Sequence, residues 1–195
     1  MASNILVMYA TTHGQAAKIA GEIVASMRSA GATASVGNVV EAWTADPRDY
    51  SAVVLVGRVH AGRFPGSLRQ WVEQHRSALA SRPTAFVAVC LAVLNRSPKV
   101  DQDLRAMLDR FTTDTGWQPA ETKIVAGALK YTKYGWLTRW MMKRIVAKAG
   151  GNVDTSRDFE YTDWDDLRDF AIRFLAGCEG RAVDELQTEN RRLVT

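Results

Sequence analysis

Five short apolar runs alternate with stretches of helical periodicity along this 195-residue chain, and this alternation constrains the fold more than any other feature. The runs that predict strands are residues 4–10, 33–39, 52–57, 84–90 and 123–129. Helices are predicted near residues 15–30, 66–80 and 101–113, where apolar side chains recur every three or four positions. Strands that alternate with helices form a parallel sheet covered on both faces. We therefore expect one α/β domain with a doubly wound, five-stranded sheet.

The first predicted strand leads directly into a short loop that is rich in hydroxyl groups and contains a glycine. Such a loop at a helix N-terminus offers free backbone N–H groups and the positive end of the helix dipole to an anion. The loop lacks the Lys of a Walker A sequence and the three spaced glycines of a dinucleotide site. We interpret it as a cradle for a monophosphate, as in flavin mononucleotide (FMN), with a plain connector as the alternative. Its residues are Thr11, Thr12, His13, Gly14, Gln15 and Ala16.

Two further loops follow the third and fourth predicted strands and should meet the first loop at one edge of the sheet. Ligands of doubly wound sheets bind outside the carboxyl ends of the strands. In the first of these loops, residues 57–64, glycines would let the backbone approach a flat ring while arginines add positive charge. The alternative is an ordinary surface loop with a solvated His60, which is also our candidate for a proton acceptor. The residues expected to flank a flavin ring are Arg58, Val59, His60, Ala61, Gly62, Arg63, Leu91, Ala92, Val93 and Asn95.

A basic and aromatic segment follows the fifth predicted strand. Residues 122–153 contain seven Lys or Arg and no Asp or Glu. This composition suits an anionic membrane surface or a large ligand that is both acidic and apolar. Packing of the aromatic side chains against the domain itself is the alternative. The residues assigned to substrate or membrane contact are Lys130, Tyr131, Tyr134, Trp136, Arg139, Trp140, Lys143 and Arg144.

The last part of the chain returns to an α/β pattern. Residues 158–161 predict a strand that rejoins the sheet, and residues 162–165 predict the capped start of a helix. The basic segment, about residues 130–155, is therefore an excursion within the last β-α unit. A charged tail, residues 178–195, follows a domain of residues 1–177.

Composition narrows the class of protein further. No apolar run reaches the roughly 18 residues of a membrane span, and no leader is recognisable, so we expect a cytoplasmic protein. Cys90 and Cys178 lack the spacing of metal ligands, which favours reduced, structural thiols and no metal site. We expect no nucleic-acid partner, because only the basic segment would support one.

Several motifs together resemble the flavodoxin-like protoporphyrinogen oxidases, and the resemblance covers nearly the whole chain to about residue 176. They are Thr11 to Gln15, Trp117-Gln118-Pro119, Ala126 to Tyr131, Tyr134, Trp136, Arg139, Met141, Gly150-Gly151, Asp154-Thr155 and Tyr161 to Trp164.

The resemblance implies a flavodoxin-like sheet of order 2-1-3-4-5 and FMN-dependent oxidation of protoporphyrinogen IX. Electrons would pass to a membrane quinone, and the enzyme would lie peripherally on the inner face of the cell membrane. Two departures from the family pattern are Ala16, where a threonine is usual, and His13. Two alternatives stay open: a soluble flavodoxin-type electron carrier, and a flavodoxin-fold module, suggested by Ala16, that has lost FMN and acts by interaction.

Overall fold

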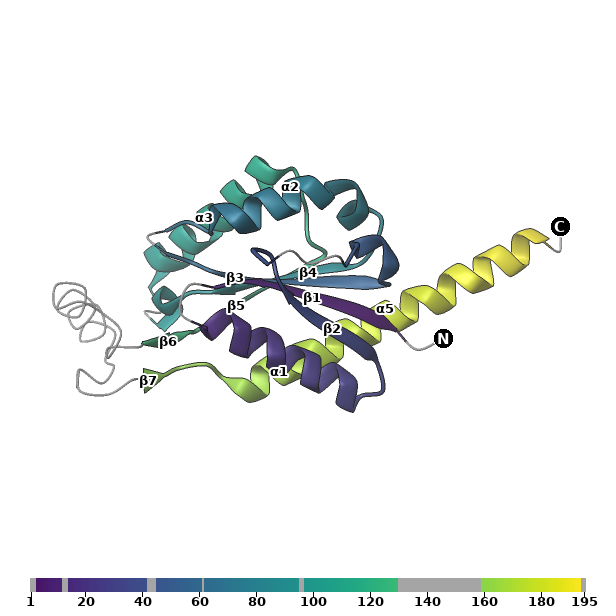
Figure 1. Ribbon diagram of the computed structural model, residues 1–195, viewed down its shortest axis with the longest axis horizontal. Coiled ribbons are helices and arrows are strands. Elements are labelled where there is room, and N and C mark those ends of the chain that lie inside the picture. The colour runs from purple at the N-terminus through teal and green to yellow at the C-terminus, as the bar shows by residue number, and fades with distance from the viewer. Residues whose placement is uncertain are drawn as a thin grey trace.

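The computed structural model describes residues 3–11, 14–41, 45–60, 62–94, 97–129 and 159–193. Its centre is a sheet of five parallel strands in the order β2-β1-β3-β4-β5 (Figure 1). The strands are β1 Asn4–Ala10, β2 Thr33–Asn38, β3 Ala52–Arg58, β4 Thr84–Val89 and β5 Glu121–Val125. This arrangement confirms the doubly wound sheet and its strand order.

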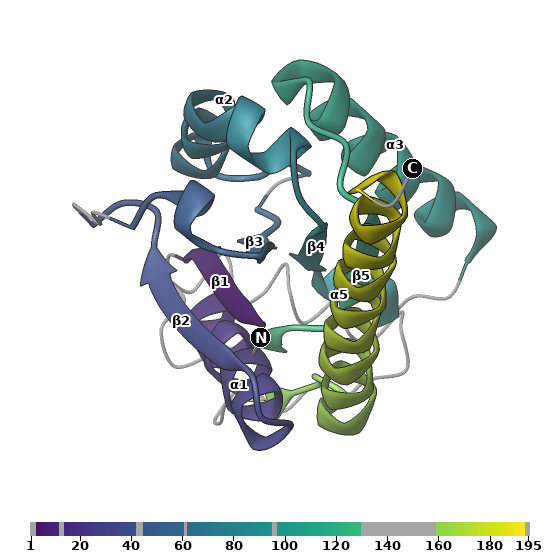
Figure 2. The same cartoon turned by 90° about the vertical axis from the view of Figure 1, so that its right-hand side faces the viewer.

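Helices cover both faces of the sheet. On one face lie α1 (Gln15–Ser29) and α5 (Trp164–Leu193), and on the other lie α2 (Gly66–Ala80) and α3 (Pro98–Thr115) (Figures 1 and 2). Two short 3-10 turns, η1 (Pro47–Asp49) and η2 (Leu91–Leu94), precede β3 and α3. The carboxyl ends of the strands therefore open on one edge of a three-layered molecule.

Two apolar cores separate these layers. Successive residues of a strand point to opposite faces, so Ile5 and Val7 of β1 pack toward α1 and α5 while Leu6 and Met8 pack toward α2 and α3. The central strands β3 and β4 are buried on both faces, apart from the last residue of β3. The loops that would position a ligand thus extend from strands that are buried on both faces.

Helix α3 begins three residues earlier than the periodicity predicts. Ser97 is its N-cap and accepts a hydrogen bond from the N–H of Val100 at 3.3 Å, with Pro98 in the first helical position. The cap and the proline start the helix before its first buried apolar residue, Leu104. Apolar periodicity alone therefore misplaces the start.

The predicted fifth strand, residues 123–129, is wrong at both ends. Strand β5 spans Glu121–Val125, and its neighbour β4 stops at Val89, so no partner strand continues past Val125. Residues 128–129 instead form β6 (Ala128–Leu129), which pairs antiparallel with β7 (Phe159–Glu160). The predicted return strand thus exists but pairs with β6 and does not rejoin the main sheet.

The basic excursion lies outside the described residues, which resume at residue 159. This gap contains every residue that the sequence assigned to substrate or membrane contact, from Lys130 to Arg144. Helix α5 follows Asp163, whose carboxylate accepts the N–H of Asp166 at 3.0 Å. The helix continues to Leu193, so the charged tail is helical over residues 178–193.

Candidate functional site

The start of α1 is open to an anion. Gly14 precedes the helix with φ 86°, a left-handed conformation that favours glycine, and its N–H donates to Oγ1 of Thr11 at 2.9 Å. Among the described residues no side chain caps this helix, and the first turn contains no Asp or Glu. The first intrahelical bond runs from the N–H of Lys18 to the carbonyl of Gly14, at 3.1 Å. The three preceding N–H groups have no partner within the helix and suit a phosphate.

Helices α3 and α5 begin differently, whereas α2 shares with α1 a start that has no side-chain cap and no acidic residue in its first turn. Ser97 caps α3, and Asp101 lies in its first turn, while Asp163 caps α5, whose first turn contains Asp165. An acidic first turn stabilises the helix dipole but repels an anion. Helix α1 thus combines an uncapped, uncharged start with a position at the carboxyl edge of the sheet.

Five of the six residues of the predicted phosphate loop divide into three groups. Thr11 and Gly14 stand at the helix start as expected, while Thr12 and His13 lie outside the described residues. Ala16 is fully buried in the core between the sheet and α1. Its methyl group therefore packs inward, and the side chain offers no polar atom to an anion.

Gln15 faces away from the expected phosphate. Its side chain is buried, and the amide nitrogen donates to Oε1 of Glu160 at 2.9 Å and to Oγ1 of Thr162 at 3.1 Å. Thr162 in turn donates to the carbonyl of Ala126 at 2.8 Å. The second carboxylate oxygen of Glu160, Oε2, forms an ion pair with Nζ of Lys18 at 2.6 Å. These bonds join the first turn of α1 to the β6–β7 pair, a link that sequence spacing does not reveal.

The loop after β3 forms a tight turn. His60 and Arg63 exchange two backbone hydrogen bonds of 2.9 and 3.0 Å, and Gly62 between them has φ 73°. The side chains of His60 and Arg63 are exposed, while Ala61 lies outside the described residues. The turn thus presents Arg63 to solvent, and the proton-accepting role of His60 stays a prediction.

Gly57 has a different reason for being glycine than the one we expected. A Cβ atom at this position would lie 2.6 Å from Cδ2 of Leu68 and 3.1 Å from Cδ1 of Phe64. The glycine therefore lets α2 pack closely on β3 and does not admit a flat ring. Phe64 also faces inward, because its ring centroid lies 4.9 Å from those of Phe86 and Phe111.

The loops after β3 and β4 lie side by side. The N–H of Val59 donates to the carbonyl of Val89 at 2.9 Å, and the N–H of Cys90 donates to the carbonyl of Val125 at 2.9 Å. Leu91, Ala92 and Val93 belong to η2 and are half-buried, while Asn95 lies outside the described residues. The structure thus brings most of the predicted ring-flanking residues to one edge.

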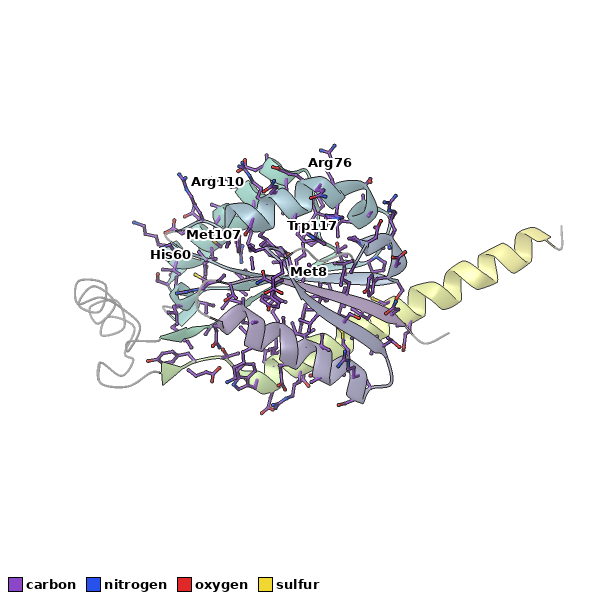
Figure 3. All side chains as sticks on the ribbon, in the orientation of Figure 1. Met8, His60, Arg76, Met107, Arg110 and Trp117 are labelled. Carbon is purple, nitrogen blue, oxygen red and sulfur yellow. The ribbon has the colours of Figure 1, made fainter. Side chains whose placement is uncertain are left out.

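A cavity of about 300 Å³ lies where these two loops meet α3. Val59, Gly62, Cys90 and Ala92 line it from the loops, and Met107 is among the residues that line it from α3. Burial raises the pKa of the Cys90 thiol. Figure 3 shows Met107 and Arg110 at the same end of the molecule as His60, where the strands end.

The comparisons with known proteins agree with this geometry. The sequence profile of the flavodoxin domain family matches residues 6–156. The chain is also 30% identical, over 85% of its length and 91% of the relative, to the Protoporphyrinogen IX dehydrogenase [quinone] of Escherichia coli strain K12. The chain belongs to the flavodoxin domain family. A Leishmania major protein of the same name is 31% identical over 66% of the chain and 55% of that protein, so the resemblance stated from the sequence is confirmed.

Solved flavodoxins share the fold of this flavodoxin-family chain. Flavodoxin 2 of Bacillus cereus superposes with a TM-score of 0.54 at 14% identity, covering 90% of this chain and 99% of the flavodoxin. Membership of the flavodoxin family indicates a flavin cofactor, and the named relatives place the chain among flavin-dependent oxidoreductases. None of the helices in the described part of the chain combines the length and apolar content needed to cross a membrane.

Proposed function

We propose that this flavodoxin-family protein uses FMN to oxidise protoporphyrinogen IX to protoporphyrin IX and passes the electrons to a membrane quinone. The observation that carries the proposal is the 30% identity, over 85% of the chain, to a protein named as a quinone-coupled protoporphyrinogen IX dehydrogenase. The open start of α1 supports it, because that site suits a monophosphate held by N–H groups.

The chain's own residues bind and orient the cofactor in this proposal. The N–H groups at the start of α1 and the hydroxyl of Thr11 receive the phosphate. The loops of Arg58 to Arg63 and of Leu91 to Asn95 flank the ring, because they end at the same sheet edge. FMN supplies the two-electron chemistry when it is bound.

Two rival functions make different predictions. A soluble electron carrier would be expected to have an acidic surface for basic redox partners, whereas this chain has 25 basic and 21 acidic residues. A module that has lost FMN would be consistent with Ala16, which has no hydroxyl for the phosphate. The carrier would hold flavin without oxidising a porphyrinogen, and the module would not bind flavin.

One anaerobic titration separates the three. The purified protein is loaded with FMN, mixed with protoporphyrinogen IX without oxygen, and followed by the flavin absorbance near 450 nm. Our proposal expects bleaching by the substrate and recovery on addition of a quinone. Flavin that binds but is not bleached would indicate the carrier, and failure to bind FMN would indicate the interaction module.

We further propose that the basic excursion docks the protein on the inner face of the cell membrane. Its six Lys or Arg between Lys130 and Lys148 could each contribute about 1 kcal/mol near an anionic surface. Trp136 and Trp140 would settle at the interface. Docking should therefore weaken as salt is added.

Co-sedimentation with vesicles that contain an anionic lipid tests this docking. The triple variant Lys143→Gln, Arg144→Gln and Lys148→Gln should lose binding. A matched control, Lys99→Gln, Arg105→Gln and Arg173→Gln, removes the same charge from exposed positions on α3 and α5 and should bind like the parent. Equal loss in both variants would show that net charge, and not the excursion, attracts the vesicle.

A further inference from the structure

A second cavity adjoins the one between the loops and shares three wall residues with it, and we call the two together the trough. The second cavity measures about 470 Å³ and lies between the turn after β3, the start of α2 and the middle of α3. Gly62, Met107 and Arg110 belong to the walls of both cavities. The trough therefore runs from the proposed ring-flanking loops outward across α3, and each of its parts lies near the range of small-molecule sites, about 300 to 1,000 Å³.

Positive charge is concentrated in the outer cavity. Arg63, Arg69 and Arg110 line it, against one carboxylate, that of Asp114. Arg69 also has an ion pair with Glu73, at 3.5 Å. Among the residues that the structure describes, neither Arg63 nor Arg110 forms an ion pair.

The wall beneath these arginines is apolar. Phe64 and Phe111 line the outer cavity with ring centroids 4.9 Å apart, and Met107 joins them. Phe111 is buried while the arginines are exposed, so charge lies at the rim and aromatic surface below it. Guanidinium groups bind carboxylates in a planar, often two-pronged geometry.

The inner cavity continues the apolar surface. It is lined by Val59, Ala92, Val100 and Leu104, among others, and Asp103 is its acidic residue. The start of α2 adds to the positive character of the outer cavity, because Gly66 lines it and no side chain caps that helix. A matching ligand therefore has an apolar ring at one end and carboxylates at the other.

We infer that the trough binds the tetrapyrrole, with its propionate carboxylates on Arg63 and Arg110 and its ring against Met107 and the apolar inner cavity. This inference rests on the proposed function, since it names the part of the protein that receives that substrate. The ring end then lies beside the loops that flank the flavin. Arg110 is central, because it borders both cavities.

Equilibrium binding of protoporphyrin IX, followed by its fluorescence, tests the trough without turnover. Arg110→Gln should weaken binding about tenfold, because a hydrogen bond to a charged group is lost. Arg110→Lys should keep part of the affinity. Arg105→Gln is the matched control, since it removes one charge from the same helix and lies beside neither cavity of the trough. Protoporphyrin IX dimethyl ester, which lacks free carboxylates, should bind all four proteins alike.

Three results would overturn the inference. One is equal affinity of the parent and Arg110→Gln for protoporphyrin IX. Another is an equal loss of affinity on Arg110→Gln for the dimethyl ester and for the free acid. The third is competition by saturating FMN, which would make the trough the cofactor's own site. The anaerobic titration decides the proposed function separately: flavin bleaching by substrate alongside unchanged binding by Arg110→Gln would refute only the trough.

Discussion

Replacing Gln15 by leucine should destabilise the protein, although the two side chains have similar volumes. The change keeps the approximate volume of the side chain but removes the buried amide that joins α1 to Glu160 and Thr162, at 2.9 and 3.1 Å. Both partners keep another bond, Glu160 to Lys18 and Thr162 to the carbonyl of Ala126. The loss is therefore confined to two hydrogen bonds, one of which ends on a carboxylate.

The magnitude follows from burial. A hydrogen bond to a charged group contributes about 1.5 to 3 kcal/mol and a neutral one about 1 kcal/mol, while the leucine recovers some apolar burial. We expect a net loss of about 2 to 3 kcal/mol. For a chain of this length the melting temperature should fall by roughly 4 to 12 °C.

Lys18→Met is the informative control. Its ion pair with Glu160 is shorter, at 2.6 Å, but the side chains are 57% and 33% exposed, and such pairs contribute about 0 to 1 kcal/mol. Its ammonium also lies 4.5 Å from the ring centroid of Trp164, a contact that methionine partly replaces. Urea unfolding of the flavin-free protein should rank Gln15→Leu as clearly more damaging. The reverse order would refute the argument that burial, and not bond length, decides which contact holds the β6–β7 pair.

Three further predictions concern other positions. Gly14→Ala should weaken FMN binding in a fluorescence titration, because alanine disfavours φ 86° by about 1 to 2 kcal/mol, whereas Gly21→Ala, where a Cβ atom would meet open space, should bind like the parent. Gly57→Ala should lower stability by about 1 to 3 kcal/mol through overpacking, and a change as small as that of Gly21→Ala would contradict the close contact. A hydrogen bond from Arg48 lowers the pKa of Asp46 from 3.8 to about 2, so the native carboxyl binds its proton less readily than the unfolded one. The stabilising contribution of the Asp46 carboxylate is complete above pH 4 and is lost between about pH 4 and 2. Asp46→Asn should therefore reduce the change of the free energy of unfolding with pH between about pH 4 and 2.

Most strands could be predicted because the apolar character of their own residues agrees with their burial in the sheet. The runs at β1, β3 and β4 are apolar in their interiors, and the predicted limits lie within one residue of those observed. Strand β5 begins with the polar Glu121 and Thr122, which pair with β4 at the edge of the sheet. The limits of this edge strand depend on its pairing with β4 and not on apolar character. The prediction used apolar character and therefore misplaced them.

The candidate site was predictable as a set of loops but not as a set of contacts. Parallel topology alone places Thr11, Arg58 and Leu91 at one edge. The direction of the Gln15 side chain depends on Glu160 and Thr162, which are about 145 residues away in sequence, so no local pattern encodes it. The same holds for the trough, whose arginines come from the turn after β3, from α2 and from α3.

The pairing of β6 with β7 bears on how this protein can change over evolution. Ala128 pairs with Glu160 and Leu129 with Phe159, so residues 129 and 159, which border the undescribed segment, belong to adjacent strands. The two ends that this segment joins therefore lie next to each other. The free energy of closing a loop rises slowly with its length. The number of residues between 129 and 159 can consequently change with little effect on the free energy of loop closure, which would let a flavin-binding fold acquire a new specificity at this position.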